Sequence, residues 1–190
     1  MIKPKKVFDG LLVLQCQNGD KKAFSLLVKR WHLKLCKQAF WYVKDPEVAK
    51  DIAQDCWTII YKRIYNLQEP NSFGSWALTI VHRKSIDWLR KEKNADKKLH
   101  AYYEDSKTSY DTVKDDTPIS DDNNFTSTDN IKVIMKAIKN LPQNLQIILR
   151  LFNLEECSIN EISSILKISK GTVKSRLFYA REKLKSILKT

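Results

Sequence analysis

Residues 158–176 have the sequence SINEISSILKISKGTVKSR, and this stretch decides the fold class of the C-terminal part of the chain. Ser158 and Glu161 have the spacing of a capping box, in which each side chain accepts a hydrogen bond from a backbone N–H of the helix N-terminus. Apolar residues then recur at helical spacing, and Ser169 can cap a second helix directly after a short turn. The stretch therefore predicts a helix–turn–helix.

The second of these helices has a polar face suited to DNA. Its apolar positions Val173, Leu177 and Ala180 fall on one side. On the other side, Lys and Arg can neutralise phosphates or bind guanine, and Ser and Thr can bind either phosphates or bases. The alternative is a solvated basic face on an ordinary helical hairpin. The candidate major-groove contacts are Ser169, Lys170, Thr172, Lys174, Ser175, Arg176 and Tyr179.

The rest of the chain also follows the helical period of 3.6 and shows no sustained alternation typical of strands. Asp45-Pro46 predicts an N-cap followed by proline at the first helical position. Residues 66–72 contain Pro70 and predict a loop. The predicted fold class is all-α, with further helices over 7–14, from Asp20 to about Phe40, from Asp45 to about Ile64, and over 73–93, 131–139 and 143–154.

The charge of the chain is divided unevenly. The 190 residues include 34 Lys and Arg and 22 Asp and Glu, a net charge of +12. Residues 1–94 carry +9, residues 95–130 carry −5, and residues 131–190 carry +8. The middle segment has many turn formers and no apolar period, which is typical of a solvated linker. We expect two small basic helical domains, 1–94 and 131–190, joined by a flexible acidic linker, 95–130. Two basic domains favour a nucleic acid with two spaced sites over an anionic membrane surface.

Several classes of protein are excluded by what the sequence lacks. Its 4 glycines cannot form a glycine-rich phosphate loop, and its 4 cysteines form no C-x-x-C and no metal-ligand spacing with the histidines. No activated nucleophile or paired carboxylates are evident, so we expect no catalytic residues, no metal, no cofactor and no enzyme activity. Without an apolar run of about 18 residues or a signal-peptide pattern, we expect a cytoplasmic protein that does not insert into membranes.

The first basic domain contains a segment that alternates aromatic and basic residues, FGSWALTIVHRKSIDWLRK over 73–91. Basic side chains suit phosphates, and neighbouring aromatic or polar side chains suit an unpaired base. Alternatives remain for single residues: Trp76 can be a core residue, His82 a plain surface residue, and Asp87 a helix-pairing partner of Arg83 or Arg90.

Three segments in order resemble the bacterial sigma factors. VAKDIAQDCW over 48–57 is similar to the core of region two, and residues 73–90 are similar to the stretch that follows it. Leu141-Pro142 with residues 158–184 resembles region four, above all GTVKSRL over 171–177. The chain begins close to the first motif and has no helical middle domain, which is similar to the extracytoplasmic-function (ECF) group.

The resemblance implies a role for each segment. Asp51, Gln54 and Asp55 would bind the clamp helices of core RNA polymerase, and region four would bind the beta flap. The loop 66–72 would receive a flipped base of the minus-ten element. The helix from Phe73 would bind adjoining minus-ten DNA, and the last helix the minus-thirty-five element. The minus-ten candidates are Asn66, Asn71, Ser72, His82, Arg83, Lys84 and Arg90.

The resemblance also implies an anti-sigma factor partner, and it places the acidic linker toward the active-site and RNA-exit channels of the polymerase.

Two positions depart from the family pattern. Arg83 and Lys84 stand where many relatives have an Asn-containing pair, so phosphate contact is expected at Arg83 in place of base contact. Lys167 stands at the turn position where glycine is usual.

Two other hypotheses compete with a sigma factor. A helix–turn–helix regulator that binds DNA alone as a dimer would explain residues 158–190, but it leaves the polar residues Asp51 and Gln54 without a purpose. A nucleic-acid-processing enzyme with a recognition domain has no supporting catalytic signature.

Overall fold

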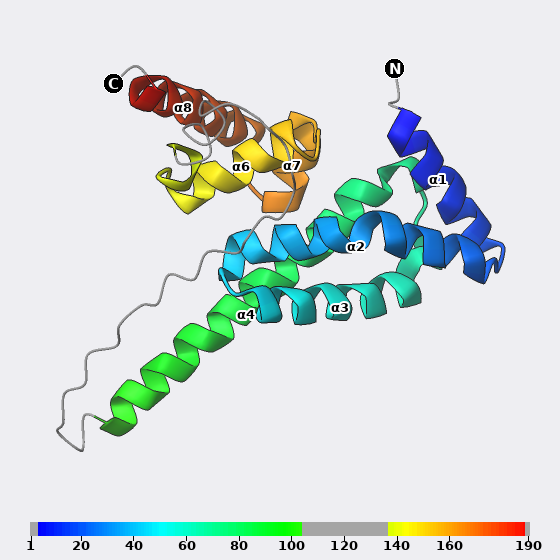
Figure 1. Cartoon of the computed structure of the whole chain (residues 1–190), viewed down its shortest axis with the longest axis horizontal. Helices are drawn as coiled ribbons and strands as arrows, with labels where there is room; N and C mark the ends of the chain where they lie inside the picture. Colours follow the sequence, from blue (N-terminus) through cyan, green and yellow to red (C-terminus); the bar gives the residue numbers. More distant parts are fainter. Residues whose placement is uncertain (1–3, 104–136, 189–190) are drawn as a thin grey trace, which may run out of the picture.

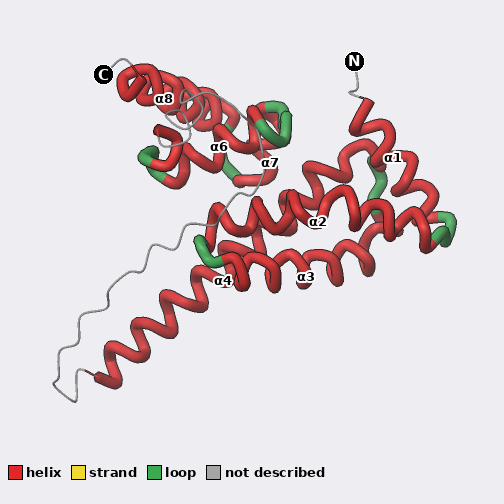
Figure 2. Tube along the Cα trace, viewed as in Figure 1, coloured by secondary structure: helices red, strands yellow, loops and turns green. Residues whose placement is uncertain are grey.

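The computed structural model describes residues 4–103 and 137–188, and for residues 95–103, 187 and 188 it describes the backbone only. Every regular element in these ranges is helical, which confirms the all-α prediction (Figures 1 and 2). The elements are α1 (Pro4–Gln17), α2 (Lys21–Val43), α3 (Pro46–Arg63), the 3₁₀ turns η1 (Ile64–Asn66) and η2 (Pro70–Ser72), α4 (Phe73–Tyr103), α6 (Gln143–Asn153), α7 (Ile159–Leu166) and α8 (Lys170–Leu188).

The first lobe, α1 to α4, is a helical bundle whose helix starts follow from capping residues. The Asp20 side chain accepts from the backbone N–H groups of Lys22 and Ala23 and so caps α2. Asp45 caps α3 in the same way, with Pro46 at the first position, as predicted. α2, α3 and α4 pack on one another, and their fully buried side chains include Leu27, Leu35, Ile60 and Leu78.

Helix α4 is longer than the sequence pattern predicted. It continues to Tyr103 and projects from the bundle, so the predicted end near Lys93 is wrong (Figure 1). Residues 95–103, ADKKLHAYY, contain neither proline nor glycine and are rich in helix formers, so local propensity extends the helix past its apolar face. The rest of the predicted linker and most of the predicted helix 131–139 lie outside the described residues.

The second lobe is built from α6, α7 and α8. Pro142 precedes α6, which confirms the predicted break at Leu141-Pro142. The capping box of α7 is also confirmed: the Glu161 backbone N–H donates to Ser158 Oγ at 3.2 Å, and the Ser158 N–H donates to Glu161 Oε2 at 2.8 Å. Lys167 ends α7 in the left-handed conformation, with φ 53°, where glycine would be unstrained.

Helix α1 is fixed to α2 by a buried carboxylate. Asp9, only 5% exposed, accepts from Trp31 Nε1 at 3.1 Å and from Arg30 Nε at 2.9 Å. The Trp31 ring packs edge-on against Phe73 and lies where a Cβ on Gly74 would come within 2.7 Å of it. The start of α4 therefore approaches α2 closely only because residue 74 is glycine.

The two lobes contact each other. Arg150 of α6 donates from Nε to Gln38 Oε1 of α2 at 3.0 Å, and both side chains are buried. Gln143 donates from Nε2 to the carbonyl oxygens of Trp41 and Tyr42 at the end of α2, each at 3.0 Å. α7 packs against α4. We call Gln38, Trp41, Tyr42, Gln143 and Arg150, together with the packed faces of α4 and α7, the inter-lobe contact.

Replacing Asp9 by alanine is expected to destabilise the first lobe by about 1–3 kcal/mol, because it leaves the buried Trp31 N–H without an acceptor. Urea unfolding followed by circular dichroism measures the change. Glu92→Ala, at an exposed position of α4, is the control and should stay within a few tenths of wild type. Equal unfolding free energies for both variants would contradict the role of Asp9.

Candidate nucleic-acid interface

Helix α8 presents the polar face that the sequence predicted. Its buried side, formed by Val173, Leu177 and Ala180, packs on α6 and α7. Ser169 Oγ accepts from the Thr172 backbone N–H at 3.0 Å, so the helix N-terminus is capped. The structure brings all seven predicted residues to the accessible side of this helix: Ser169, Lys170, Lys174, Ser175 and Tyr179 are exposed, and Thr172 and Arg176 are half-buried.

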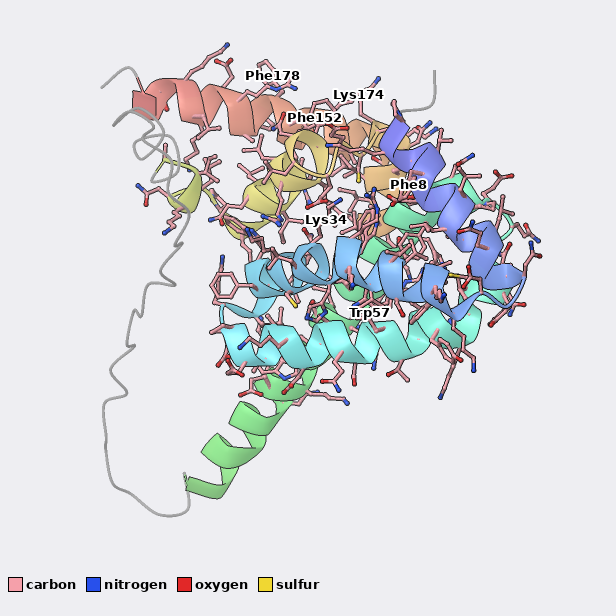
Figure 3. The ribbon with its side chains drawn as sticks, turned by 45° about the vertical axis from the view of Figure 1, so that its right-hand side comes forward. Phe8, Lys34, Trp57, Phe152, Lys174 and Phe178 are labelled. Carbon is pink, nitrogen blue, oxygen red and sulfur yellow. The ribbon has the colours of Figure 1, made fainter. Side chains whose placement is uncertain are left out.

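One accessible residue of α8 was missed by sequence reasoning. Phe178 is 61% exposed and packs edge-on against Tyr179, with ring centroids 5.9 Å apart. In Figure 3 Phe178 and Lys174 lie on the outer side of α8. Its position directly after the core residue Leu177 could have indicated an outward ring. An exposed apolar ring beside basic groups can contact a thymine methyl group.

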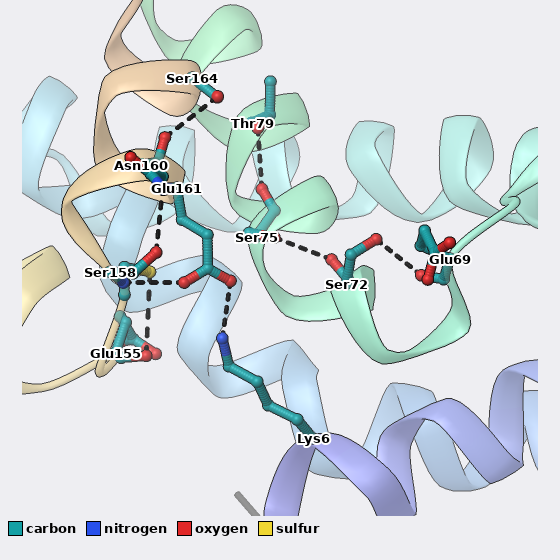
Figure 4. Close-up of polar contacts among 11 residues, drawn as sticks. Lys6, Glu69, Ser72, Ser75, Thr79, Glu155, Ser158, Asn160, Glu161 and Ser164 are labelled. Carbon is teal, nitrogen blue, oxygen red and sulfur yellow. Dashed lines mark hydrogen bonds and ion pairs between the residues drawn. The ribbon is translucent and has the colours of Figure 1, made fainter. Parts of the chain in front are cut away.

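The loop between α3 and α4 carries the predicted base-binding residues. Asn66 and Asn71 are exposed, and Ser72 is half-buried. Ser72 Oγ donates to the Glu69 carbonyl at 2.6 Å, and Ser75 Oγ donates to the Ser72 carbonyl at 3.0 Å (Figure 4). Short internal hydrogen bonds therefore give the loop a defined shape.

The predicted minus-ten residues of α4 differ in accessibility. Arg83 and Arg90 are exposed, and Arg90 lies 3.8 Å from Asp87, its default helix partner. His82 is half-buried, and its Nδ1 lies 3.0 Å from the Tyr42 hydroxyl. Burial, then the charges of Arg83 and Lys167, lower the pKa of His82, so a neutral ring is favoured at pH 7. His82 therefore contacts Tyr42, whose carbonyl oxygen accepts from Gln143 of the second lobe.

The predicted polymerase-binding residues share one face of α3. Asp51, Gln54 and Asp55 are all exposed, while Ile52 and Ala53 between them are buried. This side of α3 is thus an acidic and polar surface that faces solvent, apart from the ion pair of Asp55 with Lys84 of α4.

One ion pair joins two surfaces that the sequence treated separately. Lys84 Nζ, a minus-ten candidate, lies 3.0 Å from Asp55 Oδ2, a polymerase candidate. Both side chains are solvent-accessible, so the pair contributes little stability and breaks at little cost.

A groove runs between the lobes and brings the α3–α4 loop near the second lobe. Asn71, Ser72 and Glu69 line one side, and Phe152, Ser158 and Glu161 are among the residues of the other. Lys6 of α1 bridges it, with its Nζ 2.6 Å from Glu161 Oε1 (Figure 4). Burial alone would raise the pKa of Glu161, but hydrogen bonds from Lys6 and from Ser158 lower it overall.

Comparison with known proteins settles which family this arrangement represents. Residues 27–95 match Sigma-70 region 2, and residues 131–184 match Sigma-70, region 4. The ECF RNA polymerase sigma-E factor of Haemophilus influenzae is 30% identical, with 96% of each chain covered. The chain belongs to the ECF sigma factors. The sigma-E factor of Escherichia coli K12 is 28% identical over 94% of this chain and 93% of its own.

Solved structures show the same fold. CnrH, in complex with the cytosolic domain of CnrY, matches with a TM-score of 0.62 at 19% identity over 96% of this chain and 97% of its own. The sigma factor RpoE of Bartonella quintana, in complex with the anti-sigma factor NepR, matches with a TM-score of 0.64 at 20% identity over 89% of this chain and 98% of its own.

Membership of this family decides between the competing hypotheses. ECF sigma factors are non-enzymatic, DNA-binding factors of transcription initiation, so the hypotheses of a processing enzyme and of a stand-alone dimeric regulator are both wrong. In the described parts of the chain, no helix is long and apolar enough to span a bilayer.

Reversing the charge of Lys174 is expected to weaken duplex DNA binding. Lys174→Glu should make the log–log salt dependence of affinity shallower by about one unit, because one phosphate contact is lost. Lys183→Glu is the matched control: it changes the same charge on α8 about 13 Å further along the helix axis, in the C-terminal half of the helix. Fluorescence anisotropy of a labelled duplex at several salt concentrations measures both. Equal effects would show that only net charge matters.

Proposed function

We propose that this ECF sigma factor binds core RNA polymerase and recognises promoters with both lobes. The α8 face binds the minus-thirty-five element, and the α3–α4 loop with α4 binds the minus-ten element. The observation that carries the proposal is the capped, exposed basic N-terminal half of α8, with all seven predicted side chains accessible. A helix N-terminus with Lys, Arg, Ser and Thr on its outer side suits a major groove.

Minus-ten recognition needs no catalytic residue. A base that leaves the duplex costs a few kcal/mol of stacking and pairing, and a protein pocket that binds the base offsets this cost. The exposed amides of Asn66 and Asn71 offer donors and acceptors for a base edge, and Arg83 offers a charge for a phosphate.

The polar face of α3 is the proposed polymerase surface. Asp51, Gln54 and Asp55 would meet basic and polar groups of the clamp helices. Because the Asp55–Lys84 pair is exposed, Asp55 can exchange Lys84 for a polymerase cation, which leaves Lys84 available to a DNA phosphate. The second lobe would bind the beta flap.

Promoter binding requires the lobes to separate. The two elements lie about 25 base pairs apart, which is about 85 Å at 3.4 Å per base pair. In this structure the lobes touch through Arg150, Gln38 and Gln143. The chain between Tyr103 and Ala137 can bridge the distance, since at about 3.3 Å per residue its extended reach is on the order of 100 Å.

An anti-sigma factor is the proposed regulator. Two proteins with this fold, CnrH and RpoE of Bartonella quintana, are seen in complex with CnrY and with the anti-sigma factor NepR. We extend such a partner to this chain, and we place the chain in the cytoplasm with the polymerase.

Reconstitution with core RNA polymerase tests the proposed function. The holoenzyme should start transcription from specific sites in a library of genomic fragments of the source organism, and core enzyme alone should not. Sequenced start sites should share two elements at fixed spacing. Absence of co-elution with core polymerase, or start sites without shared elements, would contradict the proposal.

Removing the polar face of α3 is expected to weaken polymerase binding. Asp51→Ala combined with Gln54→Ala should lower the affinity for core enzyme about thirtyfold, because each of the two lost interfacial contacts costs about 1 kcal/mol. Gln15→Ala, an exposed amide of α1, should leave it unchanged. Surface plasmon resonance with immobilised core enzyme gives both values, and equal affinities would place the polymerase surface elsewhere.

Weakening the inter-lobe contact is expected to open the free protein. Gln143→Ala removes the amide that donates to the Trp41 and Tyr42 carbonyls, and a loss of about 1 kcal/mol shifts the closed-to-open ratio about fivefold. Small-angle X-ray scattering should show a larger radius of gyration. Asn144→Ala, at the neighbouring exposed position of α6, should scatter like wild type. Identical curves for all three proteins would refute a role for this contact.

A further inference from the structure

Helix α1 holds the beginning of the α3–α4 loop. The side-chain amide of Gln17 donates from Nε2 to two loop carbonyl oxygens, those of Ile64 and Leu67, each at 2.9 Å. These carbonyls belong to the first residue of η1 and to the residue that follows η1, and the turn is closed by the Leu67 N–H donating to the Ile64 carbonyl at 3.2 Å. One amide of α1 thus fixes the backbone on both sides of Asn66.

The same helix holds the end of the loop. A Cβ on Gly10 would lie 2.3 Å from Asn71 Oδ1 and 3.2 Å from the Asn71 backbone nitrogen. Real Cβ atoms do not approach other atoms so closely, so the Asn71 side chain occupies its place only because residue 10 is glycine. α1 packs along η2 here, and Asn71 remains exposed on its other side.

Helix α1 is itself firmly placed, so it can act as a support. Asp9, the neighbour of Gly10, is buried and accepts from Trp31 and Arg30 of α2. Cys16, the neighbour of Gln17, is buried in the core. Each loop-holding residue therefore lies next to a residue that anchors α1 to the bundle.

We propose that α1 is a positioning element for base recognition, in which Gln17 and Gly10 hold the loop 64–72 in the shape that receives an unstacked base. This inference rests on the proposed minus-ten role of the loop. A loop that is ordered before binding loses less conformational entropy when the base enters, and its side chains meet the base edge in one geometry. Neither Gln17 nor Gly10 needs to touch DNA.

Randomised promoter templates test the proposal. The minus-ten positions are randomised in a promoter recovered from the genomic library, and transcripts made by holoenzyme are sequenced. Gln17→Met removes the donating N–H groups and keeps the side-chain length. It should lower the base preference at one or two minus-ten positions about fivefold, with minus-thirty-five preference and core affinity unchanged. Gln15→Met is the matched control on the exposed side of α1 and should keep the wild-type profile.

A second variant separates positioning from stability. Gly10→Ala favours the helix intrinsically, because alanine has the higher helix propensity, but its methyl group displaces the Asn71 side chain. It should lower the same base preferences without lowering the thermal unfolding midpoint. If Gln17→Met fails to fold, as judged by circular dichroism, the base-preference profile of Gly10→Ala alone tests the proposal. Wild-type preferences in the folded variants would overturn the proposal. A wild-type holoenzyme that transcribes with no minus-ten preference would overturn the proposed function of the loop instead.

Discussion

The hydrogen bond between the Trp31 indole and the buried Asp9 carboxylate is the interaction on which the first lobe depends. Burying an ionised carboxylate is costly unless it is paired, and here Trp31 and Arg30 both donate to it. The pair fixes α1 on α2. The same indole ring limits how closely α4 approaches, since Phe73 and Gly74 pack on it. The α3–α4 loop therefore lies between two elements, α1 and the start of α4, that are both positioned by Trp31.

Local sequence predicted the elements well because the signals at helix ends are local. Asp20, Asp45 and Ser158 cap helices through backbone groups two or three residues away, and such contacts follow from spacing alone. The end of α4 was predicted wrongly because the apolar face stops near Lys93 while helix propensity continues. The polar face of α8 was predicted almost completely. Phe178 was missed because only side chains with a polar group were considered as DNA contacts on this face.

The long-range contacts could not be predicted from spacing. Nothing in the sequence near Gln17 indicates that its amide has two acceptors 47 and 50 residues away. Likewise, nothing near Arg150 indicates that its partner lies 112 residues away. Gly10 is unremarkable in a helix until the position of Asn71 is known. These contacts depend on how the helices pack, and they determine the shape of the loop and the closure of the lobes.

The chemistry of the inter-lobe contact explains how two basic lobes can touch. Segments of +9 and +8 repel, so the contact is made largely by neutral amides, Gln38 and Gln143, whose hydrogen bonds salt does not screen. The charged exceptions are the Lys6–Glu161 ion pair between α1 and α7, and Arg150. Burial lowers the pKa of Arg150, and its carboxylate partner Glu155, 3.6 Å away, belongs to its own lobe. Opening the lobes would therefore leave Arg150 paired with Glu155. If the lobes separate, Arg150 also becomes hydrated, and this hydration offsets part of the free energy of the lost hydrogen bond to Gln38.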